Sequence, residues 1–251
     1  MLPIGDDNSY RLRTPVVTWL LIAANIAVFV FLQGFGTDER FVYSYSMVPQ
    51  EILSGRDLVT PDRAVVDQET GERYLVPGLG ATPVPIYLTI LISMFMHGGL
   101  AHIGGNMLFL SIFGDNVEDR LGHFRFLLFY LLAGILGAAA HILVSAFLGD
   151  GLLTPTLGAS GAISGVMGAY LLLFPGNRVR VLLFNIIPTT VSAIVVIGLW
   201  FVFQVVNGFG YLGGIRGDGV AYAAHIGGFA YGFFGVRRWV PRRRRRVRYY
   251  Y

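Results

Sequence analysis

The sequence predicts an all-α, polytopic membrane protein: a bundle of six transmembrane helices with a long extracytoplasmic loop after the first helix. Its composition supports this fold class. Hydrophobic residues make up 54% of the 251 residues and charged residues only 14%, whereas soluble domains carry about 25% charged residues. The chain contains no Cys, which excludes disulfides, thiol nucleophiles and Cys-ligated metal sites.

Apolar runs bounded by charged residues define the expected spans, because a charge is costly at the centre of a bilayer. We expect a cytoplasmic N-terminus over 1–14, a first transmembrane helix over 15–33, an extracytoplasmic loop over 34–85, a core with helices two to six over 86–236, and an Arg-rich cytoplasmic tail over 237–251. The first run is interpreted as a retained helix, because no small-residue site for signal cleavage follows it.

Five segments of the core are expected to be embedded helices after a short, partly embedded piece over 86–96. These helices are predicted over 100–113, 126–148, 152–174, 181–207 and 220–236. Pro155 predicts that the helix within 152–174 begins late, near Gly158, and Arg178 and Arg180 are expected in a short basic turn.

The distribution of charge predicts the orientation. An even number of spans places both termini on one side, and with that side inside, 14 of the 19 Arg lie in cytoplasmic segments. The loop over 34–85 carries eight acidic residues and four Arg, and it is placed outside. We therefore expect a multi-pass protein of a bacterial cytoplasmic membrane with both termini cytoplasmic. The tail is expected to contact anionic lipid headgroups, and no nucleic-acid partner is expected.

Polar residues occur in the outer turns of the second, fourth and sixth expected helices. They are His102 and Asn106 in the second, Ser160 in the fourth and His225 in the sixth. These three helices all run inward from the outer face, so their polar residues are expected at a similar depth, in a site that opens to the extracytoplasmic side. Polar groups inside a membrane usually face the bundle interior and serve a function.

Two glycine stripes, 161–165 and 228–232, predict that the fourth and sixth helices pack closely, because small residues let helix backbones approach. Such packing brings Ser160 near His225. A Ser hydroxyl becomes a nucleophile when a neighbouring base accepts its proton, and imidazole suits that task near neutral pH. His102, Asn106 and the Ser160 N–H could then stabilise an oxyanion.

Other chemistries are less well supported. A zinc protease lacks a His-Glu-x-x-His motif, and an aspartyl protease lacks two Asp inside spans. A metal site built from His97, His102 and His225 has no carboxylate or Cys beside it at that depth. We therefore expect no metal and no cofactor. A purely structural role remains an alternative for any single one of these polar residues.

Three segments resemble the rhomboid intramembrane serine proteases. They are His97-Gly-Gly-Leu-Ala-His102-Ile-Gly-Gly-Asn106, Gly158-Ala-Ser160-Gly161, and Ala224-His225-Ile-Gly-Gly228-Phe-Ala-Tyr-Gly232. They correspond, in order, to the His-x-x-x-Asn, Gly-x-Ser-Gly and Ala-His-x-x-Gly-x-x-x-Gly patterns of that family. The resemblance covers about residues 86–236, with the first span also in place.

The resemblance implies a Ser–His dyad with no third carboxylate. Ser160 would be the nucleophile and His225 the general base, and His102, Asn106 and the Ser160 amide would form the oxyanion hole. The residues expected to have structural or supporting roles are His97, His141, Gly158, Gly161, Gly228 and Gly232. The implied substrates are transmembrane proteins, cleaved within or beside their transmembrane segments in the bilayer.

Two other classes of function stay open at this point. One is a catalytically inactive rhomboid-like protein that binds client membrane helices, although such proteins normally lack the Ser or the His. The other is a small-molecule transporter, for which the sequence offers no inverted repeat. The sequence predicts no oligomeric state.

The chain departs from the family pattern in two places. Ser164 stands four residues after the nucleophile, where some members have an aromatic residue that stacks on the catalytic His, so Ser164 or Tyr222 are the candidates to hold His225. A Trp-Arg pair in the first loop is also absent. Mobile elements are expected in the fifth helix and over 206–220, where glycines cluster at 208, 210, 213, 214, 217 and 219.

Overall fold

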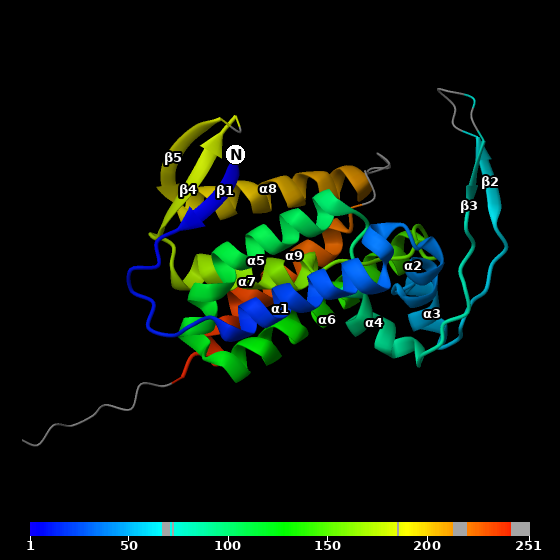
Figure 1. The fold of residues 1–251 in the computed structure, drawn as a ribbon, viewed down its shortest axis with the longest axis horizontal. Coiled ribbons are helices and arrows are strands. Elements are labelled where there is room, and N and C mark those ends of the chain that lie inside the picture. The colour runs from blue at the N-terminus through cyan, green and yellow to red at the C-terminus, as the bar shows by residue number, and fades with distance from the viewer. Residues whose placement is uncertain (67–70, 72, 185, 213–219, 242–251) are drawn as a thin grey trace, which may run out of the picture.

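The structure is a computed structural model that describes residues 1–66, 71, 73–184, 186–212 and 220–241. Most of them form helices that lie side by side in one bundle (Figure 1). The helices are α1 (Val16–Ala27, continued by a π-helical turn over Val28–Leu32), α2 (Glu39–Tyr45), α3 (Pro49–Ser54), α4 (Thr89–Ser93), α5 (Leu100–Leu121), α6 (His123–Leu148), α7 (Ser160–Leu173), α8 (Ala193–Leu212) and α9 (Tyr222–Gly235). The Arg run over 242–246 and the glycines 213, 214, 217 and 219 lie outside the described residues.

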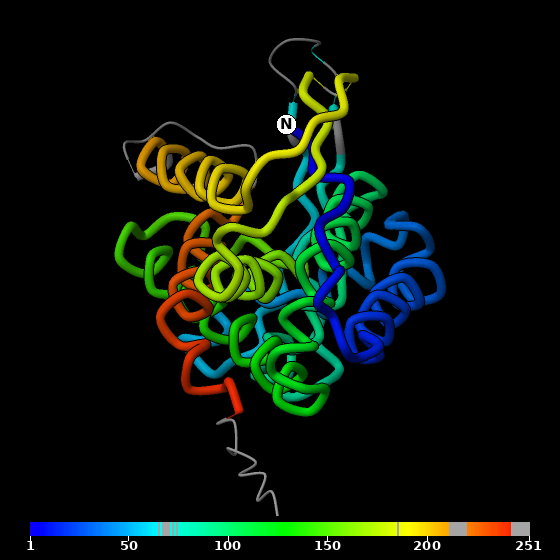
Figure 2. The backbone as a smooth tube through the Cα atoms, turned by 90° about the vertical axis from the view of Figure 1, so that its left-hand side faces the viewer, coloured from blue at the N-terminus to red at the C-terminus, as the bar shows by residue number. Residues whose placement is uncertain are grey.

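Helix α7 is the centre of the bundle (Figure 2). Residues 161–170 are all buried, as expected for a helix that is surrounded by other helices. Large aromatic side chains fill the space between α7 and its neighbours; Phe113, Phe129 and Tyr170 are fully buried. Helix α8 lies at the edge of this packing (Figure 2).

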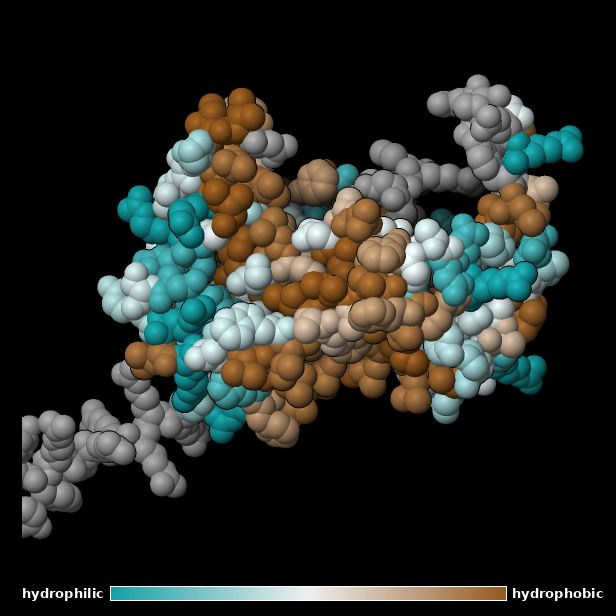
Figure 3. Space-filling model, in the orientation of Figure 1, coloured by the Kyte–Doolittle hydropathy of each residue, from teal (hydrophilic) through white to brown (hydrophobic). Residues whose placement is uncertain are grey.

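The outer surface has the hydropathy of a membrane protein. Hydrophilic residues gather at the two ends of the bundle, and a hydrophobic belt covers the face between them (Figure 3). Among the described residues, two helices are long and apolar enough to cross a membrane, His123–Leu148 and Ala193–Gly210, while Val16–Leu32 and Ser160–Leu173 are apolar but shorter. The number of six spans therefore stays a prediction.

Helices α7 and α9 touch along their glycines. A Cβ atom built on Gly228 would lie 2.0 Å from the Gly161 carbonyl oxygen, and one on Gly232 would lie 1.9 Å from the Gly165 carbonyl oxygen. The two glycine stripes thus face each other in register, each glycine of α9 against one carbonyl of α7. No larger residue fits this contact without separating the helices.

The fold is mostly helical, in agreement with the predicted class, but it also contains strands that were not predicted. Strands β1 (Leu2–Asp6), β4 (Arg178–Leu183) and β5 (Ile187–Ser192) form an antiparallel sheet in the order β1-β4-β5. The basic turn expected around Arg178 and Arg180 is wrong: both residues lie in β4, where exposed Arg alternates with the buried Val179 and Val181. This alternation is the pattern of a strand.

The fifth helix consequently begins at Ala193, twelve residues later than the start predicted at Val181. The apolar run over 181–192 is long enough to suggest a helix, but it is rich in β-branched residues and contains Pro188, both of which disfavour a helix interior. Pro188 lies in β5, an edge strand, where the missing N–H is tolerated.

The segment over 34–85 contains α2, α3 and a hairpin of β2 (Arg63–Val66) and β3 (Arg73–Val76). It is attached to the chain just before α7: Met47 and Thr156 exchange both of their backbone hydrogen bonds, at 3.2 and 2.8 Å. Main-chain pairing of this kind is how the segment holds its position without the Trp-Arg pair. Of the loop's acidic residues, Asp67, Glu69 and Glu72 lie outside the described residues.

The N-terminal segment closes one end of the bundle. The Glu118 carboxylate accepts hydrogen bonds from the N–H groups of Val17 and Thr18 at the start of α1, at 2.8 and 2.7 Å, and Arg11 pairs with Asp115. Strand β1 and the 3₁₀ turn Val236–Arg238 lie at this same end (Figure 1).

We predict that Gly232→Ala lowers the free energy of unfolding by roughly 1–3 kcal/mol, the usual cost of overpacking, because the added methyl group meets the backbone of α7. The measurement is the midpoint of thermal unfolding in detergent. Gly198→Ala is the matched control, since a Cβ atom at this position in α8 would have no neighbour within 4 Å. Equal midpoints for Gly232→Ala and the unmodified protein would contradict this account of the contact.

Candidate active site

Ser160 is the first residue of α7, and the preceding turn sets its position. Gly158 has a φ of +129°, a conformation that side chains other than glycine rarely adopt. Its N–H donates to the Ser93 carbonyl oxygen at 2.9 Å, which ties the turn to α4. The chain therefore enters α7 at a defined point, and the Ser160 hydroxyl can bind a side chain of another helix.

His225 lies in the first turn of α9 and meets Ser160 directly. Its Nε2 atom is 2.7 Å from Ser160 Oγ, although the two residues are 65 positions apart in sequence. The imidazole is only 9% exposed. The glycine contact between α7 and α9 places both residues at the same end of that contact, which is why they meet.

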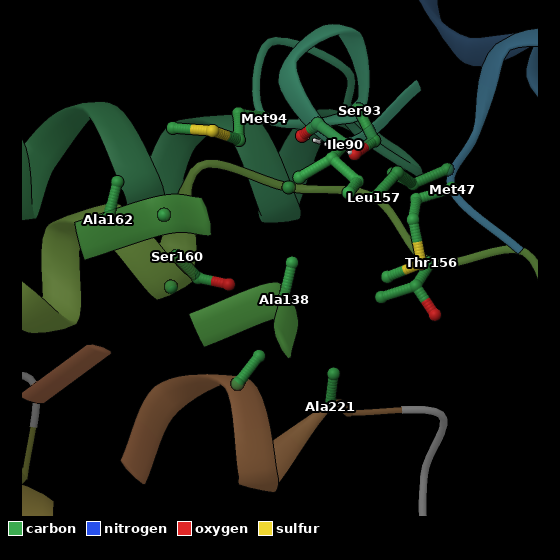
Figure 4. A pocket seen from close by; sticks show the side chains of 14 residues that line it. Met47, Ile90, Ser93, Met94, Ala138, Thr156, Leu157, Ser160, Ala162 and Ala221 are labelled. Carbon is green, nitrogen blue, oxygen red and sulfur yellow. Dashed lines mark hydrogen bonds between the residues drawn. The ribbon is translucent and has the colours of Figure 1, made fainter. Parts of the chain in front are cut away.

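The Ser160 side chain projects into a small cavity (Figure 4). Ser93, Ala138 and Thr156 line it, together with other residues of α4, α6, α7 and α9, Met47 between α2 and α3, and Ala221 just before α9. Most of the lining residues are small, and Ser160 is half-buried and not fully enclosed. A nucleophile has to be accessible in this way.

The His102 ring lies next to Ser160, against Gly158: a Cβ atom on Gly158 would be 2.9 Å from His102 Nε2 and 3.5 Å from Ser160 Oγ. The Gly98 N–H donates to His102 Nδ1 at 3.3 Å. A backbone N–H can only donate, so Nδ1 of the neutral ring is the acceptor and Nε2 carries the proton. His102 therefore presents an N–H donor beside Ser160.

Asn106 follows His102 by one turn on α5, and its side chain is buried. Its Nδ2 atom donates to the His102 carbonyl oxygen at 3.1 Å. An amide nitrogen has two N–H groups, so one donor is left after this bond. Besides the N–H groups of His102 and Asn106, the backbone of Ser160 supplies a third donor, because the N–H groups of a first helical turn have no partner within the helix.

His97 is completely buried, and its ring lies edge-on to His102 with 5.0 Å between the centroids. Gln33, at the end of the first helical segment, binds both backbone groups of His97: Nε2 donates to its carbonyl oxygen at 3.0 Å, and Oε1 accepts from its N–H at 2.9 Å. His97 thus joins the end of α1 to the turn that carries His102. These contacts give it a supporting position beside the pair.

His141 binds the segment that leads into α7. Its Nε2 atom lies 3.1 Å from the Oγ1 atom of Thr156, which is four residues before Ser160. The glycines 161, 228 and 232 lie in the contact of α7 with α9, as described above. The structure therefore brings Ser160, His225 and His102 together, with the other expected residues around them.

Ser164 and Tyr222 were predicted to hold His225, but the hydrogen bonds at its two ring nitrogens involve other residues. Ser164 Oγ donates to the Ser160 carbonyl oxygen at 2.6 Å within its own helix. The Tyr222 ring lies edge-on to His225 with 6.5 Å between the centroids. The Trp200 ring is tilted by 35° to the imidazole, at 6.1 Å.

The partner of His225 on its other nitrogen is Gln204 of α8, which the sequence analysis did not identify. Gln204 Oε1 lies 2.7 Å from His225 Nδ1, and Gln204 is 5% exposed. The available signal was an isolated amide inside the apolar run that forms α8, since polar residues inside a membrane usually face the bundle interior.

Within the described part of the chain, no three His, Asp or Glu side chains lie close enough together to hold a metal ion. His225 binds both Ser160 and Gln204, whereas the two ring nitrogens of the buried His97 have no hydrogen-bond partner among the described residues.

Comparison with known proteins gives the chain its family. Residues 86–239 match the Rhomboid domain family. Similar curated proteins include rhomboid protease GluP of Bacillus subtilis, 39% identical over 150 residues that cover 59% of this chain and 28% of the relative. Rhomboid protein 1, mitochondrial, of Saccharomyces cerevisiae is 31% identical over 165 residues, 64% of this chain and 45% of the relative. RHOMBOID-like protein 4 of Arabidopsis thaliana is 33% identical over 144 residues, which cover 57% of this chain and 32% of the relative.

The match to the family covers Ser160, His225, Gln204 and the segment from His97 to Asn106. The chain spans less than half of the length of each of these three relatives. The three segments that carried the resemblance, the mostly helical fold and the matched domain lead to one conclusion: this chain belongs to the rhomboid family of integral membrane proteins.

Proposed function

We propose that the chain is an intramembrane serine endopeptidase that cleaves within or beside the transmembrane segments of other membrane proteins. The observation that carries the proposal is the 2.7 Å contact between Ser160 Oγ and His225 Nε2. Rhomboid relatives that are named as proteases, such as the Bacillus subtilis protein, support it.

In the first half of the reaction, Ser160 Oγ attacks the carbonyl carbon of the scissile peptide bond and its proton passes to His225 Nε2. Negative charge then develops on the carbonyl oxygen. The Ser160 N–H, His102 Nε2–H and the remaining N–H of Asn106 are the donors proposed to stabilise it. The positive end of the α7 dipole adds to this effect.

In the second half, His225 gives the proton to the leaving amine, and the C–N bond breaks to leave an acyl-enzyme on Ser160. A water molecule then loses a proton to His225 and attacks the ester carbon. Collapse of this second tetrahedral intermediate returns the proton to Ser160 Oγ and releases the new carboxyl group.

The short length of α7 supports access of water from one side of the membrane. Its 14 residues span about 21 Å, less than the roughly 30 Å of a bilayer core. If its C-terminal end reaches the interface next to β4, its N-terminal Ser160 lies below the opposite surface. The Arg distribution predicts that the end with β1 and β4 faces the cytoplasm, so the cavity at Ser160 opens to the other side.

A substrate helix has to reach this cavity from the lipid, and the space between α5 and α8 is the proposed route. An apolar groove lies there, lined by Phe109 of α5, by Met1 and Pro3 of the N-terminal segment, and by four residues of α8: Val196, Leu199, Trp200 and Phe203. Helix α8 lies at the edge of the bundle (Figure 2) and exposes much of its apolar surface. The substrate must unwind locally to present its carbonyl, because helical carbonyls are hydrogen-bonded.

We predict that Ser160→Ala lowers the rate of cleavage of a transmembrane reporter by roughly 10³-fold or more, as removal of a nucleophile does elsewhere. The assay uses purified protein in proteoliposomes. Ser164→Ala is the matched control and is expected to keep its activity, because this hydroxyl of the same helix binds the Ser160 carbonyl and not His225.

Labelling with a fluorophosphonate separates the enzyme from the client-binding alternative. An activated Ser160 reacts with the probe, and Ser160→Ala does not. If the unmodified protein neither cleaves nor reacts but retains bound client helices, the endopeptidase proposal is wrong and the catalytically inactive relative is the better description.

We further predict that Asn106→Ala lowers kcat by roughly 10²–10³-fold, the effect of losing one oxyanion donor, with little change in KM. Asn207→Ala is its control: Asn207 also donates to a carbonyl four residues earlier on its own helix, that of Phe203. An equal effect of the two substitutions would exclude Asn106 from the oxyanion hole.

A further inference from the structure

Gln204 is a buried amide on a helix that is otherwise apolar around it. Burying an amide without a partner costs free energy, and Gln204 finds its partner outside its own helix, at His225 Nδ1, 2.7 Å away. Asn207, one turn further along α8, instead returns its Nδ2–H to the Phe203 carbonyl oxygen. Of the hydrogen bonds that these two amides form, the one made by Gln204 reaches the proposed catalytic pair.

We propose that Gln204 is the positioning residue of the catalytic base: its amide oxygen holds His225 in the tautomer whose Nε2 can accept the Ser160 proton. This inference rests on the proposed endopeptidase function. It adds a third member to the expected Ser–His pair and assigns that role to a neutral side chain on α8.

The tautomer follows from the atoms in contact. The group that faces His225 Nδ1 is Gln204 Oε1, and an amide oxygen can only accept a hydrogen bond. Nδ1 therefore carries the single proton of the neutral ring. Nε2 is left with its lone pair, and the atom it faces at 2.7 Å is Ser160 Oγ. The other tautomer would place an N–H against the hydroxyl and could not accept its proton.

The aromatic neighbours of His225 cannot replace this contact. Trp200 and Tyr222 pack near the imidazole, with centroids 6.1 and 6.5 Å away, and they restrict the plane of the ring. Contacts between ring faces do not distinguish Nδ1 from Nε2. In Ser-His-Asp proteases a carboxylate at Nδ1 selects the tautomer and orients the ring; here an amide oxygen meets the same geometric requirement without adding a charge inside the membrane.

The contact also links two helices at the site. Gln204 is on α8 and His225 is on α9, so the orientation of the base depends on the position of α8 relative to α9. Val196 and Ile197 of α8 are buried together with Gln204 on the inward side of that helix. The base is therefore positioned by packing of α8, while the nucleophile is positioned by the glycine contact of α7.

The test compares Gln204→Met, Gln204→Glu and the control Asn207→Leu in the full chain, reconstituted in nanodiscs. Met has a similar length but no acceptor, and we expect it to lower kcat by roughly 10²–10⁴-fold, the range of general-base catalysis, with KM unchanged. Glu restores an oxygen acceptor in either protonation state and is expected to recover most of the lost kcat. Asn207→Leu is expected to cleave at the unmodified rate.

A spectroscopic measurement reports the tautomer independently of activity. The chain has five His, and ring ¹⁵N spectra of ¹⁵N-His protein, with His225 assigned by comparison with His225→Ala, show which nitrogen is protonated. We expect a protonated Nδ1 in the unmodified protein and in Gln204→Glu, and a loss of this preference in Gln204→Met.

Three results would overturn the positioning role. The first is an unmodified protein whose His225 carries its proton on Nε2, and the second is Gln204→Met with unchanged kcat. The third applies if Gln204→Met unfolds at a lower temperature than Asn207→Leu: a Gln204→Glu variant that is folded but inactive. Absence of any Ser160-dependent cleavage in the unmodified protein is a different outcome, because it contradicts the proposed function while the spectra still test the contact.

Discussion

Two helix backbones touch where α7 meets α9, and the position of the proposed catalytic pair follows from this contact. Gly228 and Gly232 lie against the carbonyls of Gly161 and Gly165, so the two helices have one register and one separation. Ser160 comes directly before the first of these residues on α7, and His225 comes shortly before the first on α9. A wider or shifted contact would separate the hydroxyl from the imidazole, because neither side chain is long enough to compensate.

The polar groups around this pair come from helices that are far apart in sequence, and each is held by another helix or turn. Gln33 binds the backbone of His97, Gly98 binds the ring of His102, and Gln204 binds the ring of His225. Inside an apolar bundle an unpaired polar group is costly. Pairing therefore stabilises the fold and, at the same time, sets which ring nitrogen donates and which accepts in His102 and His225.

The helices were predictable from the sequence because their signal is local. Charged residues at the ends of apolar runs bound α6 and α9 closely, and Pro155 indicated the late start of α7. The sheet was not predicted, since the run after Arg180 is apolar enough for a span. The exposed Arg178 and Arg180 alternating with buried valines are a strand pattern, but the partners of β4 are β1 and β5, and β1 lies at the opposite end of the chain.

The sequence by itself determined the residue types of the site, their order and their places near the starts of three helices, because these depend on motifs of a few residues. Only the tertiary structure decided which side chains share a hydrogen bond. Ser164 and Tyr222 were equally good candidates for holding His225, yet α8 supplies Gln204 instead. The identity of such a partner depends on the rotation of α8 about its own axis and on its packing against α9, and no short stretch of sequence encodes either.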